Sequence, residues 1–122
     1  MLNAHEPYVV EFLHPVAVRT ATGNGAGIDV RDFVGRGKLT VDCAAGTGTT
    51  PTLDIRLQDS EDNVTFADIP GLTFAQVTTV ASQQQRGITL DAVRRFIRVA
   101  FTVGGTTPSF TFSATLQGWR QG

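Results

Sequence analysis

The sequence predicts an all-β protein: a single-domain antiparallel β-sandwich or jelly roll with a less regular N-terminal arm. Three observations support this. Apolar and polar residues alternate in several segments, short stretches rich in Gly, Pro and Asn separate them, and no segment carries an apolar stripe of helical period. A chain of 122 residues suits one domain with its own core. We expect the sandwich over residues 16–122 and an arm or edge segment over residues 1–15.

Alternation is strongest in three segments, residues 53–58, 97–103 and 110–116. Successive side chains of a strand point to opposite faces, so each segment has one apolar and one polar face. The β-branched and aromatic residues in these segments favour the same structure. We therefore expect three strands, each with one face on the core.

The tetrapeptide Gly-Thr-Thr-Pro occurs twice, at residues 48–51 and 105–108. Glycine tolerates positive φ and proline suits turns, so we expect two hairpins of similar construction. They could come from an old duplication or from convergence on one turn, and the failure of the intervening segments to align favours convergence. Residues 82–87, Ser-Gln-Gln-Gln-Arg-Gly, indicate a loop.

The N-terminal segment is apolar but poorly periodic. Tyr8, Phe12 and Leu13 are the candidate partner-contact residues of an arm that orders only against a neighbouring protein. A plain edge strand explains the same residues equally well.

The composition of the chain indicates which classes of partner to expect. Charged residues make up 17% of the chain, which is few for a soluble protein and favours assembly. The net charge is −1, without the basic stripe that binds phosphates, so nucleic acid is not an expected partner. The sequence shows neither a signal peptide nor an apolar run of membrane-spanning length. We therefore expect no membrane association, and synthesis in a cytoplasm.

Few side chains suggest chemistry, so we predict a protein that is not an enzyme, with no catalytic, cofactor-binding or metal-binding residues. His5 and His14 lack an evident third metal ligand. Cys43 alternates with apolar residues and is expected to be buried. No serine occupies a nucleophile elbow.

The acidic cluster near residue 60 departs from a calcium loop and predicts a solvated turn; its members are Asp59, Glu61, Asp62 and Asp68. Sugar binding would use exposed aromatic side chains. Trp119 and Tyr8, the only Trp and Tyr, lie near opposite ends of the chain, so this function is a weaker alternative.

Two segments carry a resemblance to a known group of proteins. They are PTLDIRLQDSEDNVTFADIPG at residues 51–71 and RFIRVAFTVGGTTPSFTFSATLQG at residues 95–118. Together with the residues that link them, they resemble small structural proteins of tailed bacteriophages over about residues 38–118.

The resemblance implies a non-enzymatic virion protein, a head decoration (cement) protein on the capsid exterior. Its implied partners are the major capsid protein and copies of itself, in a closed homo-oligomer expected to be a trimer. A tail or neck component and a carbohydrate-binding module are the alternatives.

Overall fold

The computed structural model describes residues 8–120 as eight β-strands. These residues contain no helix long and apolar enough to cross a membrane. The strands are β1 (Tyr8–Arg19), β2 (Gly23–Asn24), β3 (Ile28–Asp29), β4 (Phe33–Cys43), β5 (Thr47–Ser60), β6 (Ala67–Thr73), β7 (Ser82–Thr89) and β8 (Phe96–Arg120). The all-β class and the antiparallel β-sandwich predicted from the sequence are confirmed. His5, in contrast, lies outside the described residues.

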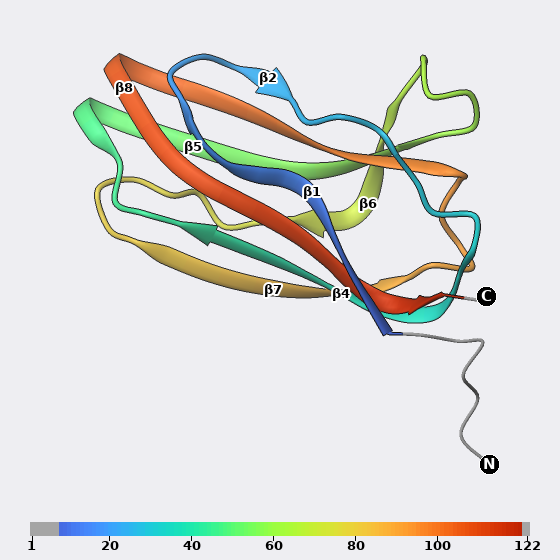
Figure 1. Cartoon of the computed structure of the whole chain (residues 1–122). Coiled ribbons are helices and arrows are strands. Elements are labelled where there is room, and N and C mark those ends of the chain that lie inside the picture. Colours follow the sequence, from blue (N-terminus) through green and yellow to red (C-terminus); the bar gives the residue numbers. More distant parts are fainter. Residues whose placement is uncertain (1–7, 121–122) are drawn as a thin grey trace.

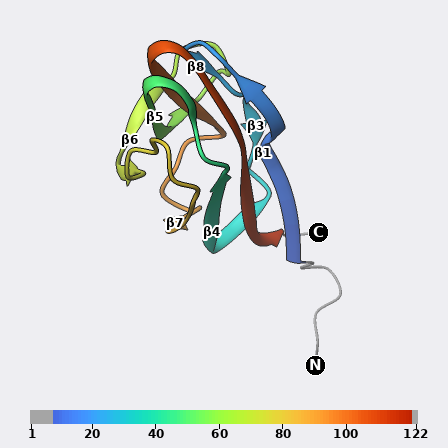
Figure 2. The same cartoon turned by 90° about the vertical axis from the view of Figure 1, so that its left-hand side faces the viewer.

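The strands form two antiparallel sheets that share β8 (Figures 1 and 2). In sheet 1 the order is β1, the C-terminal half of β8, β4 and β7. In sheet 2 it is β2 with β3, the N-terminal half of β8, β5 and β6. The expected loop at residues 82–87 is wrong, because β7 covers it and pairs with β4.

The two Gly-Thr-Thr-Pro segments are corners at which the chain changes sheets, and the expectation of two hairpins is wrong. β4 lies in sheet 1 and β5 in sheet 2, and β8 makes the opposite crossing within one strand of 25 residues. The apolar faces on the two sides of each corner therefore face each other across the core. In a hairpin they would lie side by side in one sheet.

The two corners pair with each other. Thr49 is opposite Thr106 in the ladder between β5 and β8. Gly48 and Gly105 have φ values of +113° and +106°. A Cβ on Gly48 would lie 2.5 Å from the Thr107 carbonyl oxygen, and one on Gly105 would lie 2.6 Å from that of Thr50. The repeated sequence thus meets the same steric requirement at both corners.

The core lies between the sheets and is built from the alternating residues. The three segments predicted as strands lie in β5 and in the two halves of β8, so they belong to two strands rather than three. They contribute the centre of the core, with side chains nearly inaccessible to solvent: Leu53, Ile55, Leu57, Ile97, Val99, Phe101, Phe110, Phe112, Ala114 and Leu116. β4 and β7 contribute further members, among them Leu39, Val41, Cys43 and Ile88. Burial of this apolar surface is the main force that holds the sheets together.

Because Val99 points into the core, a charge at this position should be strongly destabilising. Val99 is fully buried, so Val99→Asp should lower the free energy of unfolding by several kcal/mol (about 4) because the carboxylate would lack a partner. Urea denaturation measures the change. Thr102→Asp is the control, since the exposed Thr102 lies on the opposite face of the same strand. Equal stability of the two variants would disprove the assignment.

The paired corners predict that alanine at either corner glycine should lower the stability by a similar amount, although the two positions lie far apart in the sequence. Gly48→Ala and Gly105→Ala should each cost roughly 1–3 kcal/mol, since each imposes positive φ on alanine and a clash with a backbone oxygen. Gly71→Ala is the control, because its φ is +80° but no atom lies within 4 Å of the added Cβ. Thermal unfolding should rank both corner variants below the control; a smaller loss at the corners would contradict the packing.

Candidate interaction surface

The three predicted contact residues lie on β1, but the structure separates them. Tyr8 and Phe12 are 53% and 55% exposed, on the outer face of sheet 1. Leu13 is 1% exposed and belongs to the core, so as a contact residue it requires correction. The predicted boundary between residues 15 and 16 falls inside β1, which forms an edge of sheet 1 along residues 8–19. Within the described residues, the N-terminal segment is thus an edge strand.

Exposed apolar side chains gather on and beside this strand. Of the eight large hydrophobic residues exposed among residues 8–120, six form what we call the β1 stripe: Tyr8, Val10, Phe12, Val16, Val18 and Trp119. The other two, Val64 and Val80, lie in separate loops. Single exposed hydrophobic residues are common, but contiguous ones mark interaction surfaces.

The register of β1 with β8 brings the two ends of the chain together. Tyr8 is opposite Trp119, and their rings meet edge to face with centroids 5.1 Å apart. Because Tyr8 and Trp119 lie near opposite ends of the sequence, their contact was not predicted from it. The alternation of Tyr8, Val10 and Phe12 was a visible signal for the stripe, whereas Trp119 joins it only through the register.

Polar side chains adjoin the stripe on the same face. Val10 is opposite Gln117, which is in turn opposite Lys38 of β4. In the next row Phe12 is opposite Thr115. The outer face of sheet 1 is therefore apolar along its β1 edge and polar toward its centre.

A bulged region anchors β1 to the core. The register with β8 shifts on both sides of His14, so that the neighbouring Leu13 and His14 are both buried. The His14 ring stacks on Phe112 with centroids 4.0 Å apart. Arg19 Nε donates a hydrogen bond of 2.9 Å to His14 Nε2. This bond requires Nε2 to be unprotonated, so the histidine is neutral.

The surroundings of His14 oppose its protonation. Burial lowers the pKa of His14 below its usual value, and the positive charge of Arg19 lowers it further. Protonation would also break the bond from Arg19. The attachment of β1 therefore depends on a neutral imidazole.

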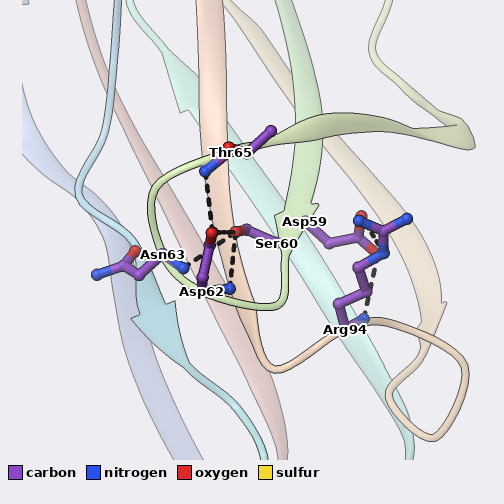
Figure 3. A network of polar contacts seen from close by, with 6 residues as sticks. All are labelled: Asp59, Ser60, Asp62, Asn63, Thr65 and Arg94. Carbon is purple, nitrogen blue, oxygen red and sulfur yellow. Dashed lines mark hydrogen bonds and ion pairs between the residues drawn. The ribbon is translucent and has the colours of Figure 1, made fainter.

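The carboxylates of Asp59 and Asp62, in the acidic cluster near residue 60, point to different partners (Figure 3). Asp62 Oδ1 accepts hydrogen bonds from the Ser60 hydroxyl and from the backbone N–H groups of Val64 and Thr65. The two N–H groups, with Ser60, lower the pKa of Asp62 to about 2. This carboxylate closes its own turn, as predicted.

The carboxylates of Asp59 and Asp68 have partners outside this turn. The Arg94 backbone N–H donates to Asp59, and the Arg56 side chain pairs with Asp68 at 3.0 Å. Among residues 8–120 no three His, Cys, Asp or Glu side chains lie close enough to hold a metal ion.

Cys43 is buried, and this burial raises the pKa of its thiol to about 11. The thiol donates a hydrogen bond to the Ala44 carbonyl oxygen at 3.2 Å. A buried, protonated thiol is a weak nucleophile.

Within the part of the chain that the structure describes, two hollows open at the surface away from the β1 stripe. One of about 250 Å³ lies between β6 and β7 and is lined mainly by apolar residues, among them Ile69, Leu72 and Val93. The other, of about 360 Å³, is bordered by Arg31, Arg94 and Arg95. Arg95 also pairs with Asp29 at 2.9 Å, and Arg94 lies 4.0 Å from Asp59, so nearby carboxylates offset part of this positive charge.

No known protein family and no curated protein matches this sequence, but solved structures share its fold. The SPBc2 prophage-derived protein YomS is similar over 97% of this chain and 99% of its own, with 13% identity and a TM-score of 0.52. A chain of the Bacillus endospore appendages, described as a family of disulfide-linked pili, is similar over 100% of this chain and 96% of its own, with 15% identity and a TM-score of 0.59.

The PBSX exported protein XepA is similar over 93% of this chain, with 16% identity and a TM-score of 0.59. This chain corresponds to 37% of the length of that protein. At these identities the comparisons establish a shared β-sandwich fold.

The neutral state of His14 predicts a pH dependence of stability. Its folded pKa lies below the unfolded value of about 6.5, so the unfolded state binds the proton more readily. The stabilisation is complete above pH ~6.5 and is lost as the pH falls from there toward the folded pKa. Urea unfolding between pH ~7.5 and ~5 should show this loss, and His14→Gln should flatten it. An unchanged slope in His14→Gln would assign the effect to another group.

Proposed function

We propose that this chain is a non-enzymatic structural protein of a bacteriophage particle that works through protein–protein contacts made by the β1 stripe. The observation that carries the proposal is the concentration of exposed apolar side chains on one edge of an otherwise polar outer face. Phe12, Trp119 and Tyr8 belong to the residue types that dominate the energetics of protein interfaces.

Within the particle, we assign the chain to the head as a decoration protein on the capsid exterior. The resemblance at residues 51–71 and 95–118 supports a phage structural role, and the fold shared with a prophage-derived protein is consistent with it. A small sandwich with few charges suits a position between protein neighbours. The proposed partners are the major capsid protein and further copies of this chain.

The trimer expected from the resemblance places a demand on the surface. A ring of three needs two different, complementary patches on each copy. Within residues 8–120, the exposed large hydrophobic side chains form one extended stripe and two isolated positions. The described residues therefore show one extended apolar patch, where a ring of three needs two. The molar mass of the free protein, measured by light scattering, decides between a trimer and a two-fold pair.

Particle association tests the proposal directly. The protein should remain with the heads through gradient sedimentation, and Phe12→Ser should weaken that binding about 10- to 100-fold because a half-buried aromatic contact is lost. Val80→Ser is the control, since Val80 is also an exposed hydrophobic residue but lies outside the stripe. Recovery of the protein only with tails would disprove the head position and support a tail or neck role.

Carbohydrate binding is the second candidate, favoured by the contact between Tyr8 and Trp119. Two exposed aromatic rings beside Gln117 offer a stacking surface with a polar neighbour. A broad glycan array decides: binding that Trp119→Ala abolishes would establish this function, and silence would reject it.

A further inference from the structure

The edges of the two sheets differ in how well they are protected. An edge strand presents unpaired backbone groups, and proteins block such edges with short strands, proline, bulges or inward-pointing charges. In sheet 2, one edge consists of β2 and β3 with two residues each. The other edge, β6, contains Pro70 and a register shift against β5.

In sheet 1, the inward-facing side chains of the edge strand β7 hinder pairing with another chain. The Gln84 side chain exchanges two hydrogen bonds with the backbone of Ala75, and Arg86 lies over the Phe74 ring at 5.2 Å. A neighbouring loop and an inward-pointing charge thus block this edge.

β1 differs along its first half. Residues 8–12 pair with β8 in unbroken register, and no strand within residues 8–120 pairs with their other side. Figure 2 shows β1 along the margin of the molecule, beside the C-terminal half of β8. Pro15 and the two register shifts interrupt only the second half.

The register shows which backbone groups face this margin. In an antiparallel ladder, alternate residues turn their backbone groups to opposite sides. The Ala44 N–H donates to the Thr111 carbonyl, so odd-numbered residues of β8 face β4 and even-numbered residues face β1. Glu11 is opposite Leu116 and therefore faces β8. Tyr8, Val10 and Phe12 face away from the sheet.

We propose that two copies of this chain pair through this edge, with Val10 of one antiparallel to Val10 of the other. This inference rests on the proposed function and names a self-contact that precedes attachment to the particle. The register aligns Tyr8 with Phe12 of the second copy, which are cross-strand aromatic partners. It also keeps Glu11 opposite Val9 rather than opposite its own copy, which a shift to a Glu11-centred register would require.

A second copy fits this edge better than an unrelated strand. Each copy brings the same alternation of outward apolar side chains, so the two stripes become one continuous band across the dimer. A two-fold contact uses one patch twice and closes the edge, so it does not continue into a fibre. The net charge of −1 adds little repulsion between copies.

Light scattering on the full chain, over a range of concentrations, tests the pairing. Wild type should have twice the monomer mass of 13.0 kDa. Val10→Pro removes an N–H that faces the margin but leaves the β8 ladder intact, and should weaken the dimer about 10- to 100-fold. Val10→Ala, which keeps the N–H, should retain most of the dimer. A monomer at all concentrations, a trimer, or a dimer unaffected by Val10→Pro would overturn the proposal.

Cross-linking tests the register independently of proline's effect on folding. Val10→Cys should form an intermolecular disulfide under mild oxidation, because the two positions face each other. Val16→Cys is the control, as Val16 is exposed on the same strand but distant from the two-fold axis, and Cys43 is buried. Equal cross-linking of both variants, or none of Val10→Cys, would reject the register.

Particle binding separates this inference from the proposed function. If Val10→Pro protein still sediments with heads and is a monomer, the proposed function stands and the dimer is not the unit that binds. A wild-type dimer that binds no phage particle would retain the pairing and reject the virion role.

Discussion

The paired corners at Gly48 and Gly105 are the constraint on which the rest of this fold depends. Each lets a strand leave one sheet and enter the other, and each leaves room only for a glycine because the carbonyl oxygens of the opposite corner lie against it. The chain passes from sheet 1 to sheet 2 between β4 and β5, and it returns from sheet 2 to sheet 1 within β8. Continuous backbone therefore joins the two sheets at both corners. The hydrophobic core forms between them as a consequence.

β1 illustrates how one strand serves both stability and contact. Its inner side contributes Leu13 and the His14 ring, stacked on Phe112, to the core. Its outer side carries apolar side chains that have no cover within the described residues. The bulge at His14 separates the two roles, because it fixes the second half of the strand to the core and leaves the first half straight along the margin.

Alternation within the sequence was sufficient to predict β strands in the centre of β5 and in both halves of β8, because a two-residue period has one structural meaning. It did not show that the segments at residues 97–103 and 110–116 belong to one continuous strand. It was not sufficient to predict which strands pair. A glycine-rich link between two amphipathic strands fits both a hairpin and a corner, and the pairing of β4 and β5 with different halves of β8 distinguishes them. Residues 82–87 were misassigned because an edge strand with polar Gln84 and Arg86 facing inward lacks the apolar signal of a buried strand. Tyr8 and Phe12 were identified from their apolar character, but the contribution of Trp119 depends on a register that spans the chain.

The pairing of Tyr8 with Trp119 has a consequence for any use of this domain as a carrier. The first described residue, Tyr8, lies opposite Trp119 at one end of sheet 1, so a passenger sequence attached directly at Tyr8 or Arg120 would emerge beside the aromatic pair and shield it. Joining those ends with a short linker and opening the chain at the polar turn around Asn63 would move a passenger to a different part of the molecule. Such a circular permutant would carry cargo while leaving the aromatic pair uncovered.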